Sequence, residues 1–483
     1  MIPYKQLSLT DIYSDCTTFF DTDKPKFLSL LEDVINLEEF IPVSFYNHFY
    51  APTGRSRKYK LHSMLWALII QRIFSIPTDT LLINFLKYSS ELRDFCGFNK
   101  VPDASKFTRF KQDFLPDLQL VFDNLVDVTE PICQNINQEL ASMTIFDSSG
   151  IEAFVTENNP KFANRIIKQL KSYAKYMGFD KSYDPYKAAY GSMPSHAESN
   201  SEIKQLYING HFCYAFKFGL TTNGLGIVRS IDFYNKQFFN DHPEIIVEKK
   251  LDSPDEDKSV HDAKLLIPTL TDFFNKHPLI KPKCFLGDAA FDSVGIYKSL
   301  FEELDFEKAF IPLNQRSKLE NKDYEVNEDG IPYCPHDSSL LMKYEGTSKL
   351  RSGVTRYKFV CPKIRWQKKD NGKYHRVCQC DNPCTDSISG RMIHLYPEKD
   401  LRAYPGSLRG TEEWDNTYKI RAVVEKAIYQ FKDSYCVANR RTQNEKTLHA
   451  DLLLSGITQL ITVVLADKIH KHEYIRSIKP LIA

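Results

Sequence analysis

The sequence lacks an excess of charge of either sign, because 63 lysines and arginines against 62 aspartates and glutamates give its 483 residues a net charge of +1. A polyanion would therefore bind through local basic patches and not through the field of the whole protein. No stretch approaches the roughly 18 to 20 apolar residues of a membrane helix. The first residues also lack the basic start and apolar run of a signal peptide. We therefore expect no membrane segment, no secretion and a cytoplasmic protein.

The sequence also lacks the paired Cys-x2-Cys motifs of a zinc ribbon. It does contain 11 cysteines, which we interpret as reduced thiols or metal ligands. Five of them lie in one segment: Cys334, Cys361, Cys378, Cys380 and Cys384. Their density suggests a structural Zn²⁺ site. Its ligands would be Cys361, Cys378, Cys380 and Cys384, with Cys334, His336 and His375 as further donors. The alternative is a set of reduced, partly buried thiols.

Residues 1–140 are predicted to form a helical N-terminal domain. The run Leu61–Phe74 is strongly apolar-periodic, and the basic cluster Gly54–Lys60 precedes it. A further helix over residues 105–114 carries Lys106, Arg109 and Lys111. Short helices with basic residues near their starts suit the binding of DNA ends. An ordinary helical bundle with solvated lysines is the alternative.

A mixed α/β pattern begins near residue 141 and continues to 313. A predicted strand over residues 142–146 ends at Asp147, and a second over 283–286 ends just before Asp288. Two further β-rich runs flank the hairpin signal Asn223-Gly224. Residues 158–205 are polar and rich in lysine and tyrosine, so we expect a loop-dominated excursion there. Because open α/β sheets place their chemistry at the carboxyl ends of strands, both aspartates are candidates for a site.

The α/β pattern is interrupted by a polar, β-leaning and cysteine-rich insertion over residues 314–405, closed by Pro405 and Gly406. Residues 406–483 are predicted to resume the core and to end in an apolar closing helix. Trp366 is the one tryptophan of the insertion.

A predicted helix near the C-terminus presents Tyr418, Arg421, Glu425 and Lys432 within roughly 60° of one face. Apolar residues fall on its opposite face: Ile420, Val423, Val424, Ala427, Ile428 and Phe431. A solvated face with an Arg421–Glu425 ion pair is one interpretation. The other is a carboxylate that holds a metal while its neighbours contact a phosphate backbone.

The order Asp147, Asp288, Glu425 favours the second interpretation. Two strand-end aspartates and one helical glutamate supply the oxygen ligands that Mg²⁺ prefers. Two such ions about 3.5 to 4 Å apart support phosphodiester chemistry. A strand-end aspartate taken alone is more often turn chemistry.

The chain resembles the bacterial insertion-sequence transposases that carry a DDE triad on an RNase-H-like core. Its helix matches their signature Tyr-x2-Arg-x3-Glu-x6-Lys at Tyr418, Arg421, Glu425 and Lys432. Gly287-Asp288-Ala-Ala-Phe-Asp292 resembles the segment around their second aspartate. Thr53-Gly54-Arg55 and the segment Val101–Phe110 resemble the helical domain that precedes such cores.

The resemblance implies an α/β fold, with an RNase-H-like mixed sheet interrupted by the insertion and preceded by the helical domain. It implies Asp147, Asp288 and Glu425 as catalytic ligands of two Mg²⁺ ions, for which Mn²⁺ can substitute. Tyr418, Arg421 and Lys432 would contact DNA, whereas Asp292 is a less secure ligand that can equally cap a helix, and Trp366 has no assigned role.

The implied function is a DNA transposase that cleaves element ends and transfers the strand to target DNA. Its partners would be double-stranded terminal inverted repeats and target DNA in a bacterial, nucleoid-associated setting, and it would be a homo-oligomer on the ends. The alternatives are a catalytically inactive or domesticated DNA-binding protein and a nuclease of the same core fold.

Overall fold

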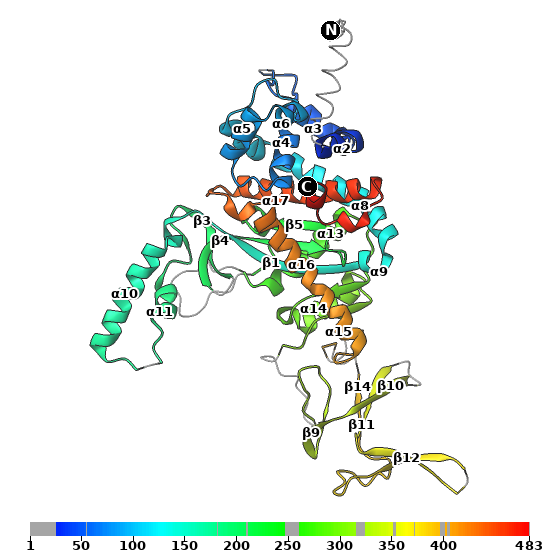
Figure 1. The fold of residues 1–483 in the computed structure, drawn as a ribbon. Coiled ribbons are helices and arrows are strands. Elements are labelled where there is room, and N and C mark those ends of the chain that lie inside the picture. Colours follow the sequence, from blue (N-terminus) through cyan, green and yellow to red (C-terminus); the bar gives the residue numbers. More distant parts are fainter. Residues whose placement is uncertain are drawn as a thin grey trace, which may run out of the picture.

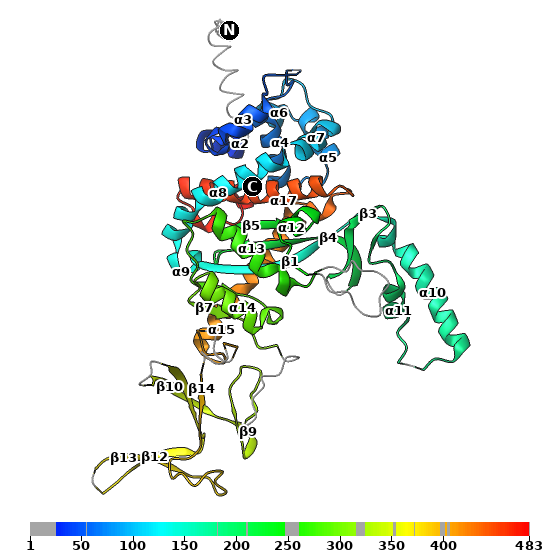
Figure 2. The same cartoon turned by 180° about the vertical axis from the view of Figure 1, so that it is seen from behind.

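The protein has a mixed α/β fold in which one central sheet lies between helices, as the sequence predicts (Figures 1 and 2). The computed structural model describes residues 26–482, apart from 55, 181, 209–210, 247–259, 315–323, 351–353, 371, 397–400 and 403–405. Two sequence features, Arg55 and Pro405, lie outside the described residues.

The central sheet has the order β2-β3-β4-β1-β6-β7, and β5 also pairs with β4. Its strands are β1 (Met143–Glu152), β2 (His196–Ala197), β3 (Asn200–Ile208), β4 (His211–Thr222), β5 (Val228–Phe233), β6 (Cys284–Leu286) and β7 (Lys308–Phe310). Strand β4 runs antiparallel to β1, β3 and β5, whereas β6 and β7 run parallel to β1. The predicted hairpin around Asn223-Gly224 is confirmed as the β4–β5 connection.

Alternate residues of β1 face two different helical layers, as the period of a strand requires. Ile145 belongs to a core that includes α16 (Ala422–Tyr429) and α17 (Glu445–Lys468). Phe146 belongs to a second core on the other face, with α13 (Asp262–Lys276) and α14 (Val294–Lys298). Odd-numbered residues of β1 therefore face the layer of α16 and α17, and even-numbered residues face the layer of α13 and α14.

Helix α17 is long and apolar enough to cross a membrane by length and composition, contrary to the expectation from the sequence. In the structure, 94% of the apolar 18-residue stretch of this helix is buried. It packs against α8 (Leu115–Ile136), α4 (Leu61–Ile73) and β5. A helix enclosed on all sides is apolar on all sides, which accounts for its composition.

The N-terminal helices share the hydrophobic core of α17, and α2 (Lys26–Val34), α4, α7 (Ala104–Asp113) and α8 pack directly on it (Figure 1). They also include η1 (Leu37–Phe40), α3 (Val43–Phe49), α5 (Asp79–Tyr88), α6 (Ser90–Phe95) and α9 (Gln138–Ala141). A buried charge network fixes them to α17, because Arg72 and Lys111 lie 2.6 Å and 3.0 Å from the Asp451 carboxylate. Lys111 also pairs with Asp79 at 2.9 Å. It is buried and is therefore not a DNA contact in this structure, unlike the expectation for its helix.

Two parts project from the sheet (Figures 1 and 2). The expected loop-dominated excursion instead contains η2 (Thr156–Asn158), an 18-residue helix α10 (Pro160–Met177) and α11 (Pro185–Ser192). Asn159 caps the start of α10 and Gly178 ends it with a φ of +68°. The described part of residues 314–405 is rich in strands, as expected. It contains β8 (Tyr333–Cys334), β9 (Asp337–Leu341), β10 (Lys343–Lys349), β11 (Thr355–Val360), β12 (Ile364–Lys368), β13 (Tyr374–Cys378) and β14 (Met392–Leu395).

The remaining elements are short. They are α12 (Lys236–Asp241), η3 (Ala289–Phe291), η4 (Ser299–Glu303), α15 (Glu412–Tyr418), η5 (Lys419–Arg421), η6 (Gln430–Ser434), η7 (Val437–Asn439), η8 (His472–Tyr474) and η9 (Lys479–Leu481).

Candidate functional site

Asp147 lies in the middle of β1, so the prediction that it ends a strand was wrong. Strand β1 continues to Glu152 because β4 pairs with it over residues 145–152. Its parallel partner β6 stops opposite Ile145. Asp147 is therefore the second residue beyond the end of β6, on the face of the sheet that packs against α16.

Asp288 follows β6 and comes near the level of Asp147. The parallel register joins Ile145 to Leu286, and both aspartates lie two residues further along the chain. Asp288 also caps η3, because its side chain accepts a hydrogen bond of 2.9 Å from the Ala290 amide. The expectation that a core strand ends just before Asp288 is thus confirmed.

The predicted helix over residues 418–432 consists of successive helical segments: the end of α15, then η5, α16 and the start of η6. Its apolar face is buried as expected, with Val424, Ala427 and Phe431 in the core. The polar face is turned toward β1. Tyr418 stacks on Trp414, with ring centroids 4.8 Å apart.

Arg421 lies between two of the predicted carboxylates. Its guanidinium is 3.4 Å from Asp147 and 2.5 Å from Glu425. Burial raises the pKa of Asp147 to about 6, Arg421 opposes that effect, and the nearby Asp288 adds to it. Burial lowers the pKa of Arg421, but the Asp147 and Glu425 carboxylates outweigh it and leave that pKa raised. This is an acidic site in which a side-chain cation holds two of the carboxylates.

Lys432 extends the same row along β1. Its ammonium donates a 2.7 Å hydrogen bond to Ser149 Oγ, and burial lowers its pKa. Ser149 is two residues after Asp147 on β1, so both side chains point to the α16 layer. The structure thus brings Arg421, Glu425 and Lys432 together along β1, with Asp288 near Asp147.

Sequence reasoning missed the opposite wall of the site. Asp262 at the start of α13 accepts a hydrogen bond of 2.7 Å from Ser148 and pairs with Lys217 at 2.5 Å. The neighbouring His261 caps α13, because its side chain accepts a hydrogen bond from the Ala263 amide. Asp262, Ser148 and Lys217 line a cleft of about 500 Å³, and Asp147, Glu425 and Lys432 line it with them.

Among the residues that the structure describes, no three carboxylate, thiol or imidazole groups form a set that can hold a metal ion. Within the predicted triad, the Arg421 guanidinium lies between the Asp147 and Glu425 carboxylates. The donor chemistry nevertheless suits a hard cation, since Asp147 is a half-buried carboxylate whose pKa is raised further by the negative charge of Asp288.

Asp292 has a structural role. It is buried and accepts hydrogen bonds from Arg402 (2.7 Å), Tyr297 and the Asn314 amide. With its carboxylate engaged in this way, Asp292 fixes the start of the insertion to the core.

The cysteines of the insertion are only partly gathered. Burial raises the pKa of Cys361 to about 11, and the neighbouring Cys378 and Cys334 thiols contribute. Cys384 lies near Cys334 and Cys378. Cys380 instead donates a hydrogen bond to the Asn382 carbonyl. The zinc site stays a prediction.

Trp366 lies on β12 with 59% of its surface exposed. The Arg376 guanidinium covers its ring at 4.8 Å from the centroid. Nothing in these contacts gives Trp366 a functional role.

A basic cleft of about 520 Å³ in the N-terminal helices joins the two basic segments of the sequence. Arg57 and Lys58 come from the cluster before α4, and Lys106 and Arg109 come from α7. Arg57 is held by the Phe49 carbonyl at 3.0 Å and lies over the Phe49 ring. Phosphate contacts are what such a cleft offers.

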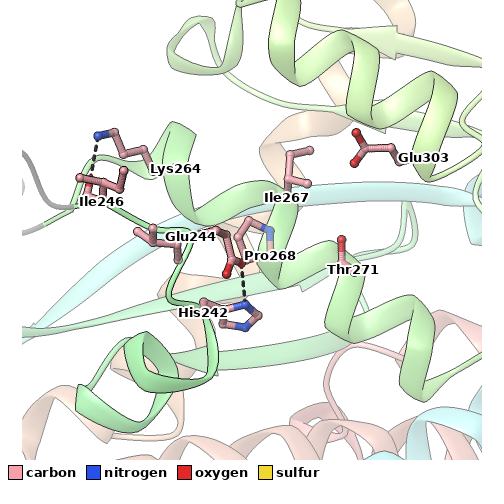
Figure 3. Close-up of a pocket in the computed structure, with 9 residues that line it drawn as sticks. His242, Glu244, Ile246, Lys264, Ile267, Pro268, Thr271 and Glu303 are labelled. Carbon is pink, nitrogen blue, oxygen red and sulfur yellow. Dashed lines mark hydrogen bonds and ion pairs between the residues drawn. The ribbon is translucent and has the colours of Figure 1, made fainter.

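A further cavity of about 560 Å³ lies beside α13, lined mostly by apolar groups (Figure 3). His242 bonds Glu244 on its rim, and Lys264 donates to the Ile246 carbonyl. None of the predicted carboxylates lines it.

Residues 18–113 match a family model described as "Transposase domain (DUF772)". This match supports a transposase, and it covers the basic N-terminal cleft but none of the predicted carboxylates. No curated protein matches the chain.

Among solved structures, the chain is similar to a piggyBac transposase in a synaptic complex with hairpin DNA, at 9% identity and a TM-score of 0.29. The similarity covers 95% of this chain and 85% of that chain. At this TM-score it carries no weight for fold or function.

Proposed function

We propose that the protein is a DNA transposase whose RNase-H-like core cleaves element ends and transfers the freed strand to target DNA. The observation that carries the proposal is that Asp147 on β1 and Glu425 on α16 both pair with Arg421, while Asp288 after β6 lies near Asp147. The transposase-domain match over residues 18–113 supports it independently.

Asp147, Asp288 and Glu425 would hold Mg²⁺ or Mn²⁺, which when bound supplies charge stabilisation and an activated oxygen for phosphodiester chemistry. Arg421 neutralises Asp147 and Glu425 in the free protein. It would have to leave them when the cations enter, and the DNA phosphate is the acceptor that its planar guanidinium then meets. Lys432, which bonds Ser149 on β1, adds a second cation beside the carboxylates.

The test is incubation of the protein with element-end duplexes and Mg²⁺, followed by analysis of cut and joined products. We expect 3′-hydroxyl ends joined to target DNA, and loss of both products in Asp288→Asn. Tight binding without cleavage would favour the inactive DNA-binding alternative. Cut ends that are never joined would favour a nuclease.

A further inference from the structure

Helix α10 is a strongly basic element in a chain with almost no net charge. Between Pro160 and Met177 it contains five cations and no acidic residue. They are Lys161, Arg165, Lys168, Lys171 and Lys175, and all five are exposed. At about 100° per residue they fall within an arc of about 120°, so they form one stripe roughly 20 Å long.

The opposite side of α10 is already occupied. Ala163 and Ile167 form a small core with Ala189 of α11, and Ile166 and Leu170 pack against it. We call α10 and α11 together the arm. The basic stripe therefore faces away from the small core that these two helices share. Among the described residues these cations form no ion pair with a carboxylate, and Lys171 instead donates a 3.1 Å hydrogen bond to the Tyr186 hydroxyl. A stripe of this kind is complementary to a polyanion.

Aromatic side chains accompany the stripe at the far end of the helix. Tyr176 is 87% exposed, and Tyr173 and Phe179 are about half exposed. Lys171 lies 4.7 Å from the ring centroid of Tyr186. Basic residues interleaved with exposed aromatic rings are typical of surfaces that bind nucleic acids.

The arm joins the sheet beside the cleft that Asp147 and Glu425 line. Residues 206–208 of β3, the second strand after α11, line the cleft with Asp147 and Glu425. Asn158, just before α10, is fixed by hydrogen bonds of 2.7 Å to the Ala153 and Tyr214 carbonyls. Figures 1 and 2 show α10 projecting from this edge of the sheet. The stripe is thus held beside the cleft and outside it.

From these observations we infer that α10 is a DNA-binding arm that contacts the phosphate backbone of the duplex beyond the cleft. The inference rests on the proposed function, since it assumes that DNA occupies the cleft. It adds a contact surface that is separate from the N-terminal cleft and from the carboxylates.

The test compares wild-type protein with a variant in which Lys161, Arg165, Lys168 and Lys175 are all changed to Gln. The control changes four exposed lysines elsewhere to Gln: Lys281, Lys298, Lys343 and Lys349. Affinity for a 40-base-pair duplex is measured across a salt series, and circular dichroism confirms that each variant is folded.

We expect the arm variant to bind at least tenfold more weakly, with a salt slope smaller by about 2 to 3, because each phosphate contact contributes about 0.9. The control variant should keep both values. Equal affinities and slopes for the arm variant and wild type would overturn the inference. A change in oligomeric state on sedimentation, with DNA affinity retained, would also overturn it and assign the stripe to contact with a second copy.

Binding is scored without cleavage, so failure of the arm inference is distinguishable from failure of the proposed function. A wild-type protein that binds DNA through the arm but never cuts it would support the arm inference and refute the proposed function. A protein that cuts with an unchanged salt slope in the arm variant would refute only the arm.

Discussion

The guanidinium of Arg421 lies 3.4 Å from the carboxylate of Asp147. The same guanidinium also holds Glu425, so one side chain neutralises two groups predicted to bind metal. This explains how an acidic cleft is stable without a metal cation. It also means that cation binding and release of Arg421 are coupled.

Replacing Arg421 tests that coupling. In Arg421→Gln we expect Mn²⁺ to bind the free protein several-fold more tightly, because its competitor for the carboxylates is gone. DNA cleavage should nevertheless fall by about 10² or more, because a phosphate contact is lost. Calorimetry and a cleavage assay measure the two effects. Lys419→Gln, an exposed neighbour, is the control, and weaker Mn²⁺ binding in Arg421→Gln would contradict the coupling.

The raised pKa of Asp147 predicts a pH-dependent cost in stability. Protonated Asp147 favours the folded state below about pH 4, and that contribution is lost as the pH rises through about 6. Asp147→Asn should therefore raise the free energy of unfolding at pH 8 by about 2 kcal/mol and have much less effect at pH 4. Urea denaturation at both values measures this.

Asp292→Asn is the matched comparison, because Asp292 is buried but paired with Arg402. We expect it to destabilise the protein at pH 8. A stability gain at pH 8 in Asp292→Asn, or no gain in Asp147→Asn, would contradict the claim that the charge of Asp292 stabilises the fold and that of Asp147 destabilises it.

The N-terminal basic cleft predicts a role in end binding. Changing Lys106 and Arg109 to Ala should weaken binding of element-end DNA by about tenfold. Cleavage at saturating protein should change little, because none of the predicted carboxylates lines this cleft. Lys87→Ala serves as a control on an exposed position. Unchanged end affinity in the double variant would remove this cleft from DNA recognition.

Zinc in the insertion is measurable directly. Elemental analysis of protein purified without chelator should find about one zinc per chain. Cys361→Ser and Cys378→Ser should lose it, and Cys380→Ser should keep it, because Cys380 is engaged with Asn382. Protein without zinc would leave these residues as reduced thiols, and loss in Cys380→Ser would restore the ligand set predicted from sequence.

Local patterns predicted the α/β class, the face of the 418–432 helix and the position of Asp288, because each depends on neighbours in the chain. The place of Asp147 within β1 was not predictable, since that strand is extended by pairing with β4. Burial of Lys111 likewise depends on Asp451, which is distant in sequence.

Helix α10 was missed for a different reason. Its polar composition suggested a loop, although Asn159, Pro160 and Gly178 are recognisable start and stop signals. Asp262 and Lys217 were missed as cleft residues because only the fold brings α13 and β4 to β1.

The most direct test of the central claim compares Glu425→Gln with Lys426→Gln, a change at the next, exposed position of α16. Both variants are assayed for Mg²⁺-dependent cleavage of element-end DNA at matched, saturating binding. We predict that Glu425→Gln loses cleavage by at least about 10³-fold while Lys426→Gln stays near wild type. Full activity in Glu425→Gln would contradict the assignment of the carboxylate site.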